Sequence, residues 1–168
     1  MEQVIAIIMV VLGYVIGAIP VGLVIVKRIT GKDIRMVGSG RSGATNVIRA
    51  AGIGAGLTTA ILDLLKGALP IWIVKLLLPE WAWIHVLTGV ATVLGHNFSI
   101  FLRETVTDSQ TGRTKTVLRG GAGGVTTVGG AIGLWVWTGA ILVPSGAAIL
   151  FGIGYASLAT MSGGIMTT

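Results

Sequence analysis

The run VIAIIMVVLGYVIGAIPVGLVIV, residues 4 to 26, contains 23 residues and no charged side chain. A helix of that length crosses the roughly 30 Å hydrocarbon core of a bilayer, because each residue adds about 1.5 Å. A cleaved signal peptide does not fit, because the N-terminus carries Glu2, has no basic segment, and leads into a run that is too long. The stretch therefore predicts a membrane-spanning helix.

The composition of the whole chain indicates the same class of protein. Of the 168 residues, 53% are hydrophobic and 11% are charged, and the sequence holds 27 glycines and no cysteine. Soluble proteins carry roughly 25% charged residues, so a cytosolic enzyme, a disordered protein and a coiled coil are excluded. Without cysteine the sequence offers no disulfide, thiolate nucleophile or zinc–sulfur site. We expect one transmembrane domain over residues 1–168, with an all-α fold: a polytopic helical bundle.

Further apolar stretches bring the expected number of spans to about five. They cover residues 51–78, 82–102, 121–143 and 146–161. Turns are predicted near residues 79–83, where tryptophans and His85 suit the membrane interface, and at Pro144–Ser145. The polar stretch 103–118 is an insertion in which alternating Thr and Val residues predict a small hairpin.

Basic residues gather in two segments that separate apolar stretches. Residues 27–49 carry a net charge of +5 and residues 103–119 a net charge of +2, within a total of +6. Positive charge favours the cytoplasmic side, and the two spans between the segments put both on one face. We therefore expect a multi-pass protein of the cell membrane with these loops in the cytoplasm. The same bias accounts for the positive charge, so we expect no nucleic-acid partner.

The segment GKDIRMVGSGRSGATNVIRAAG, residues 31–52, predicts a phosphate site at the membrane surface. Small residues let the backbone direct N–H groups at an anion, hydroxyl and amide side chains add donors, and a following helix adds its dipole. The residues expected to bind phosphate there are Gly38, Ser39, Gly40, Gly43, Thr45, Asn46 and Arg49. The alternative is a flexible cytoplasmic loop whose basic residues fix the topology.

Charged and imidazole groups within the spans form a second set of candidates. Asp63 and Lys66 lie inside an apolar stretch, where charges are costly and usually functional. Their spacing suits an ion pair on one helix face, so Lys66 either completes a structural pair or lies near a bound phosphate. His96 is expected close to the cytoplasmic end of a span, within reach of a substrate hydroxyl, unless it is a packed histidine.

The segment RGGAGGVTT, residues 119–127, is a possible second phosphate cradle. Its candidate residues are Arg119, Gly120 and Gly121, which precede an apolar stretch. Glycine-rich helix packing gives a similar string, so the segment alone is weak evidence. On the predicted topology it shares a face with the first glycine-rich segment, which strengthens both predictions.

These motifs resemble those of the bacterial membrane glycerol-3-phosphate acyltransferases that use acyl-phosphate as the acyl donor. The matching segments, in the family's order, are GAIPVG, GSGRSGATNVIR, DLLKG, GHNFSIF and RGGAGGVTT. The resemblance implies transfer of a fatty acyl group from acyl-phosphate to the 1-hydroxyl of glycerol-3-phosphate, without cofactor or metal. The alternatives are a non-catalytic membrane transporter or lipid-binding protein, and an inactive diverged relative.

The resemblance also implies roles for individual residues. Ser39 and neighbouring amides would form a phosphate hole, Arg49 would pair with the phosphate of glycerol-3-phosphate, and Arg119 would replace a family lysine. His96 and Lys66 match family positions, and the base is either His96 or a phosphate oxygen of the substrate. We favour the substrate oxygen, because the sequence places no carboxylate near His96 to orient its ring.

The match departs from the family pattern at several positions. Arg41 replaces an asparagine, Ser99 a proline, and Arg119 and Ala122 two lysines. The family's C-terminal motif H-x-x-N-I-x-R has no counterpart before Thr168, and its members have about seven spans. We expect either a piece of a longer protein or a diverged member with altered activity.

Overall fold

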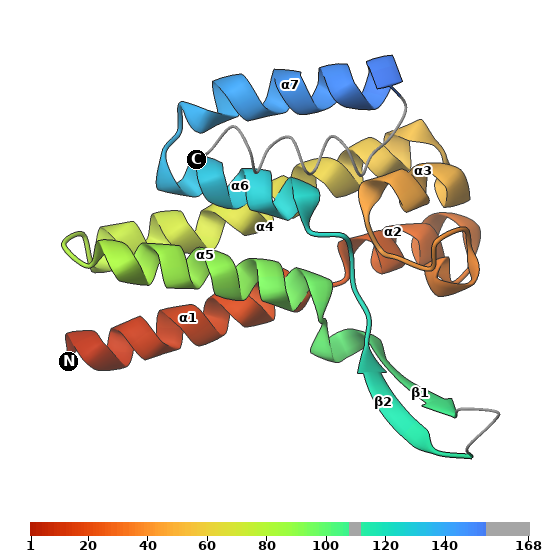
Figure 1. Cartoon of the computed structure of the whole chain (residues 1–168), viewed down its shortest axis with the longest axis horizontal. Coiled ribbons are helices and arrows are strands. Elements are labelled where there is room, and N and C mark those ends of the chain that lie inside the picture. The colour runs from red at the N-terminus through yellow and green to blue at the C-terminus, as the bar shows by residue number, and fades with distance from the viewer. Residues whose placement is uncertain (108–111, 154–168) are drawn as a thin grey trace.

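The computed structural model describes residues 1–107 and 112–153 as a helical bundle with a β-hairpin at one end (Figure 1). In chain order its elements are α1 (Glu2–Ala18), α2 (Val21–Thr30), the 3₁₀ turn η1 (Ile34–Met36), α3 (Ala44–Ala51), α4 (Ile53–Leu77), α5 (Ala82–Asn97), the 3₁₀ turn η2 (Ile100–Leu102), β1 (Arg103–Thr107), β2 (Thr114–Leu118), α6 (Gly124–Leu134) and α7 (Thr138–Ile153). Within these residues, Glu2–Thr30 and Ala82–Leu102 are long and apolar enough to cross a membrane. The predicted helical bundle is confirmed.

The first expected span, residues 4–26, contains a break. α1 ends at Ala18 and α2 starts at Val21, with Ile19 at φ −58° and ψ 117° between them. Pro20 causes the break, because it lacks an N–H donor and disfavours helical geometry in the residue before it. α2 then leaves the line of α1 and packs beside α3 and α4 (Figure 1).

The expected boundaries of the last two spans are wrong. The stretch 121–143 holds α6, a turn, and the first part of α7, which continues through Pro144. The turn lies at residues 135–137, where the Thr138 N–H donates to the Trp135 carbonyl, and not at Pro144–Ser145. Apolar helices tolerate proline when neighbouring groups satisfy the freed carbonyl. The expected span 146–161 falls partly outside the described residues.

The predicted hairpin is confirmed in the inserted segment. β1 and β2 pair antiparallel, with Arg103 opposite Leu118 and Glu104 opposite Val117. The backbone N–H of Arg119 donates to the carbonyl of Leu102 at 3.1 Å, which continues the pairing by one step beyond β2. The base of the hairpin is therefore fixed to the end of the bundle.

Glycines allow the long helices to approach one another closely. A Cβ added at Gly17 of α1 would lie 2.0 Å from the carbonyl oxygen of Thr92 in α5. A Cβ at Gly129 of α6 would lie equally close, 2.0 Å, to the carbonyl oxygen of Leu64 in α4. Small residues at such contacts provide the van der Waals packing that holds helices together in a membrane. These contacts fix the ends of α5 and α6, where the candidate site lies.

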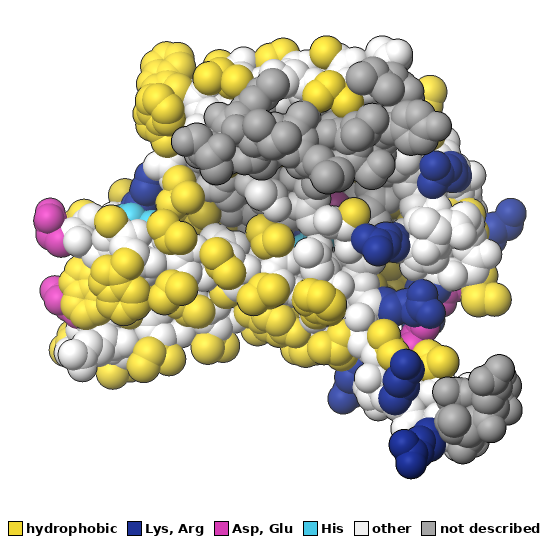
Figure 2. All heavy atoms as spheres, viewed as in Figure 1, with side chains coloured by type: hydrophobic (Ala, Val, Ile, Leu, Met, Phe, Trp, Pro, Cys, Tyr) yellow, Lys and Arg dark blue, Asp and Glu magenta, His cyan; other side chains and the backbone are white. Residues whose placement is uncertain are grey.

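The two basic segments lie at the same end of the bundle, as predicted. The N–H of Ser42 in the first donates to the carbonyl of Gly120, which directly follows the second, at 3.3 Å. Figure 2 shows the Lys and Arg side chains at this end and a broad apolar surface over α1 and α5. At the opposite end Trp81 and Trp83 stack, and His85, expected at the interface, is buried with Nε2 2.8 Å from the Leu78 carbonyl.

Candidate active site

The loop between α2 and α3 folds around the side chain of Asn46. This side chain is buried, and its Nδ2 donates to the carbonyls of Val37 and Arg41, both at 2.9 Å. Its Oδ1 accepts the backbone N–H of Ser39 at 3.3 Å. Asn46 directs its hydrogen bonds into the loop, so its structural part in the site is to hold the loop in shape.

Two glycines give this loop its sharp curvature. Gly38 has φ +52° and Gly40 has φ +68°, conformations that other residues adopt only with strain. A Cβ at Gly38 would also lie 2.5 Å from Oδ1 of Asn46. The loop therefore depends on glycine for backbone angle at both positions and for space at the first.

Backbone N–H groups that could bind an anion lie at the starts of two helices. The N–H groups of Ser39, Gly40 and Ser42 donate to acceptors inside the protein. The N–H groups of residues 43–45, where α3 begins, and of residues 124–126, where α6 begins, donate to no acceptor among the described residues. A Cβ at Gly43 would lie 4.0 Å from the nitrogen of Ala122, so the start of α3 lies beside the segment leading into α6. Helix N-termini carry partial positive charge and suit phosphate.

The second glycine-rich segment lies directly against His96. A Cβ at Gly121 would be 2.0 Å from Nε2 of His96, and a Cβ at Gly120 would be 2.1 Å from its carbonyl oxygen. The N–H of Gly121 donates to that same carbonyl at 3.0 Å. These two glycines bring the backbone up to the imidazole, while Gly129 and its neighbours serve helix packing. The close approach of Gly120 and Gly121 to His96 is thus distinct from the helix packing at Gly129, which lies beyond the segment 119–127.

Asp63, Lys66 and His96 form one buried cluster next to these loops. Lys66 Nζ lies 2.8 Å from Oδ1 of Asp63, and Nδ1 of His96 lies 3.8 Å from the same oxygen. Asp63 is 2% exposed and His96 5% exposed. The predicted ion pair is confirmed, although the contact is not directed as a hydrogen bond, and Oδ1 has no hydrogen-bond partner among the described residues.

The fold supplies a carboxylate beside His96 that is distant from it in sequence. Asp63 comes from α4 and His96 from the last turn of α5. The lack of a carboxylate near His96 in the sequence is therefore no argument against His96 as the base. Lys66 also donates to the carbonyl of Ile19 at 3.1 Å, so it joins α4 to the break between α1 and α2.

An open pocket of about 520 Å³ lies between the two glycine-rich segments. Five of the predicted site residues line it: Ser39, Gly40, Arg119, Gly120 and Gly121. The other lining residues are Arg41, Asn97, Phe98, Val117 and Leu118. The remaining predicted residues lie around it, with Gly38, Gly43, Thr45, Asn46 and Arg49 on the first loop and α3, and Lys66 and His96 in the buried cluster.

Arg49 is exposed, and its aliphatic stem packs near Gly38, where an added Cβ would lie 3.6 Å from Cδ. Neither Arg49 nor Arg41 has an ion-pair partner among residues 1–107 and 112–153. Both guanidinium groups are therefore available to an anionic ligand at this end of the bundle.

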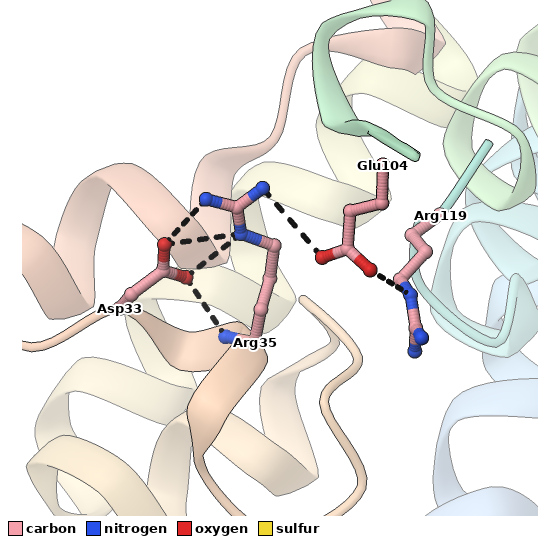
Figure 3. Close-up of polar contacts among 4 residues, drawn as sticks. All are labelled: Asp33, Arg35, Glu104 and Arg119. Atoms are coloured by element: carbon pink, nitrogen blue, oxygen red, sulfur yellow. Dashed lines mark hydrogen bonds and ion pairs between the residues drawn. The ribbon is translucent and has the colours of Figure 1, made fainter. Parts of the chain in front are cut away.

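A row of alternating charges borders the pocket (Figure 3). Arg35 contacts Asp33 at 2.5 Å through Nη2 and Glu104 at 3.6 Å through Nη1. The second oxygen of Glu104 lies 2.5 Å from Nε of Arg119. Hydrogen bonds from Arg35 hold the pKa of the Asp33 carboxyl below its ordinary value. The two arginines and two carboxylates thus join the first loop to the hairpin.

Several residues of this region were not predicted from the sequence, and Glu104 and Asn97 are the most informative. Glu104 belongs to no motif, and only the folded hairpin brings it between Arg35 and Arg119. Asn97 lines the pocket, and its buried Oδ1 has no hydrogen-bond partner in the described part of the chain. The sequence could have indicated Asn97 as a pocket residue through its position directly after His96.

The comparisons with known proteins agree on one family. Residues 7–168 match the sequence profile described as glycerol-3-phosphate acyltransferase. The glycerol-3-phosphate acyltransferase of Myxococcus xanthus is 44% identical over 95 residues, which cover 56% of this chain and 50% of that protein. One from Thermus thermophilus is 38% identical over 163 residues, covering 92% and 69%. The chain thus spans about half of the first relative and about two thirds of the second.

Solved structures show a similar fold. The crystal structure of PlsY (YgiH), an integral membrane glycerol 3-phosphate acyltransferase, superposes in its glycerol 3-phosphate form with a TM-score of 0.79 and 33% identity. The match covers 95% of this chain and 72% of that one. Its lysophosphatidic acid form gives a TM-score of 0.77 and 30% identity, with 96% and 72% covered. The predicted class, an integral membrane helical bundle, is confirmed.

Proposed function

Because the chain belongs to the glycerol-3-phosphate acyltransferase family, we propose that it transfers a fatty acyl group from acyl-phosphate to the 1-hydroxyl of glycerol-3-phosphate. The products are lysophosphatidic acid and inorganic phosphate, and the reaction is the first step of phospholipid synthesis. The observation that carries this proposal is the convergence of two glycine-rich basic segments beside His96, with Gly121 against the imidazole and Ser42 bonded to Gly120.

The residues at this end suit a reaction between two phosphate compounds. Arg41 and Arg119 line the pocket, Arg49 lies on the adjoining helix, and the starts of α3 and α6 add unpaired N–H groups. Acyl-phosphate is an activated mixed anhydride, so the acyl group needs no prior transfer to a serine or cysteine. Ser39 acts as a hydrogen-bond donor to phosphate. Positioning and charge stabilisation then supply most of the rate.

The proton of the attacking hydroxyl goes to a phosphate oxygen of the substrate. Asp63 is placed to orient His96, but His96 is buried, and Gly121 lies against the ring nitrogen that faces the second loop. A substrate hydroxyl would have to displace Gly121 to reach that nitrogen. His96 instead accepts the Gly121 N–H through its carbonyl and supports the loop. In the alternative, His96 is the general base, and its replacement would remove about 10²–10⁴-fold of the rate.

The protein is proposed to lie in the cell membrane with its basic end in the cytoplasm. That orientation follows from the concentration of Lys and Arg at one end of the bundle (Figure 2). It places the pocket where the water-soluble glycerol-3-phosphate is made, while acyl-phosphate reaches the pocket from the bilayer.

The function is tested with the purified chain in detergent. We expect inorganic phosphate to be released from acyl-phosphate in a reaction that requires glycerol-3-phosphate. A non-catalytic transporter would release no phosphate and would instead accumulate glycerol-3-phosphate in liposomes. Release that is independent of glycerol-3-phosphate would identify a hydrolase and contradict the proposal.

A further inference from the structure

We propose that Glu104 is a positioning residue that holds the guanidinium group of Arg119 at the pocket, so that the inserted hairpin takes part in anion binding. Glu104 lies in β1, and Arg119 follows β2. The choice of glycerol-3-phosphate as the anion rests on the proposed function. The positioning itself rests on the contacts of these two side chains.

The contacts divide the guanidinium of Arg119 into two edges. Its Nε lies 2.5 Å from Oε2 of Glu104, while a Cβ at Gly40 would lie 3.7 Å from its Nη1. Gly40 and Arg119 both line the pocket. A guanidinium carries five N–H donors, four of them on the two Nη atoms. Glu104 therefore occupies one edge and leaves the Nη donors for a ligand.

Glu104 is itself held from two sides. Its backbone is paired with Val117 in the hairpin, and its other carboxylate oxygen, Oε1, lies 3.6 Å from Nη1 of Arg35. Arg35 is held in turn by Asp33, as Figure 3 shows. The Glu104 side chain is 25% exposed and that of Arg119 is 45% exposed. The side chain of Glu104 is thus more buried than the side chain of Arg119 that it positions.

Simple electrostatics predicts the opposite effect of Glu104. A carboxylate close to an anion pocket repels the ligand, so its neutralisation alone would tighten anion binding. Positioning predicts weaker binding, because an arginine without its anchor must be ordered again when the ligand arrives. The sign of the change therefore distinguishes the two roles.

The experiment measures equilibrium binding of glycerol-3-phosphate to the full chain in detergent by titration calorimetry, and it needs no turnover. We expect Glu104→Gln to raise Kd about three- to tenfold, within the usual coupling between neighbouring residues. In an Arg119→Ala background the same change should not weaken binding further. Glu80→Gln is the control, because it neutralises an exposed carboxylate at the opposite end of the bundle, and its effect should stay below about twofold.

Tighter binding by Glu104→Gln would overturn the inference in favour of repulsion. An equal loss with and without Arg119 would also overturn it, because Glu104 would then act through the fold of the hairpin. Melting temperatures of all variants, measured in the same detergent, identify a misfolded protein, and Glu104→Ala repeats the test if Glu104→Gln misfolds. A chain that binds neither glycerol-3-phosphate nor inorganic phosphate has no such site, which overturns the inference. A chain that binds as expected without turnover supports it and contradicts the proposed function.

Discussion

Arg49 combines three properties that suit a phosphate ligand. It lies in the last turn of α3, its stem packs near Gly38, and its guanidinium has no ion-pair partner in the described residues. An arginine without a carboxylate partner, at the end of a bundle that is rich in positive charge, keeps its bidentate donors for a ligand.

Replacing Arg49 is expected to weaken the binding of glycerol-3-phosphate. Arg49→Ala should raise the apparent KM for this substrate by the equivalent of roughly 2–3 kcal/mol, the strength of hydrogen bonds to charged groups. Arg49→Lys should recover part of the loss, because a point charge cannot form the bidentate fork. Arg28→Ala is the control, since it removes an exposed positive charge from α2 at the same end. Unchanged kinetics in Arg49→Ala would remove Arg49 from the site.

His96 distinguishes the two possible bases. Because the imidazole is buried behind Gly121, His96→Ala should lower kcat by much less than the 10²–10⁴-fold (approximately) typical of a lost general base. The measurement is kcat per folded protein, with the melting temperature as control. A loss of more than about a hundredfold in a normally folded variant would make His96 the base.

The pocket residues divide into those that the sequence could indicate and those that it could not. Ser39, Gly40 and Gly121 lie in short motifs whose small residues have a local reason, namely backbone curvature or close approach. Glu104 meets Arg119, and Asp63 meets His96, only because the fold brings different elements together, and no local pattern indicates either contact. Asn46 lies within a motif, but the motif does not indicate that its side chain is buried under the loop. That burial directs its hydrogen bonds to carbonyls of the loop.

At the scale of elements, hydropathy located some helices and misplaced others for a physical reason. α4 and α5 lie within a few residues of the expected spans, because a proline and an acidic residue interrupt the apolar run between them. Between α1 and α2, and between α6 and α7, the side chains stay apolar through the break, so hydropathy does not change. Pro20 directly precedes α2 while Pro144 lies inside α7, so a proline alone does not locate the end of a helix.

Lys66 joins α4 to the break between α1 and α2 through its hydrogen bond to the carbonyl of Ile19. Lys66→Met would leave the Asp63 carboxylate buried without its cation and would remove the donor to the Ile19 carbonyl. We expect a loss of about 3–5 kcal/mol of unfolding free energy, the usual cost of breaking one partner of a buried pair. Denaturation in mixed detergent micelles measures it.

Lys75→Met provides the matched control for that prediction. Lys75 lies in the same helix, and its ammonium donates to the carbonyl of Leu134 at an exposed position. Its replacement should cost less than about 1 kcal/mol, as for other exposed contacts. Equal losses in the two variants would show that the Asp63–Lys66 pair has no special part in stability.

At the scale of the whole molecule, the bundle is polarised along its length. Most of the basic residues and both glycine-rich segments occupy one end, while the stacked Trp81 and Trp83 occupy the other (Figures 1 and 2). The apolar surface of α1 and α5 lies between the two ends, where lipid chains would cover it. The polarity predicts the orientation of the protein in the membrane.

Single cysteines test that orientation cleanly, because the sequence contains none of its own. Lys32→Cys and Lys115→Cys, both at exposed positions of the basic end, should react with an impermeant reagent only after the membrane is opened. Glu80→Cys, exposed at the opposite end, should react in intact cells. Labelling of Lys32→Cys or Lys115→Cys from outside intact cells would reverse the topology.

The central claim is that the two glycine-rich segments together form the acyl-transfer site. The most direct measurement follows lysophosphatidic acid formed from radiolabelled acyl-phosphate and glycerol-3-phosphate, by the parent chain and by two alanine variants. Gly121→Ala places a methyl group 2.0 Å from His96, whereas a Cβ at Gly54 meets no atom within 4 Å. We predict that the parent and Gly54→Ala form one lysophosphatidic acid per phosphate released, and that Gly121→Ala loses at least about tenfold in rate, a cost of roughly 1.4 kcal/mol. Full activity in Gly121→Ala, or phosphate release without lysophosphatidic acid, would contradict the account.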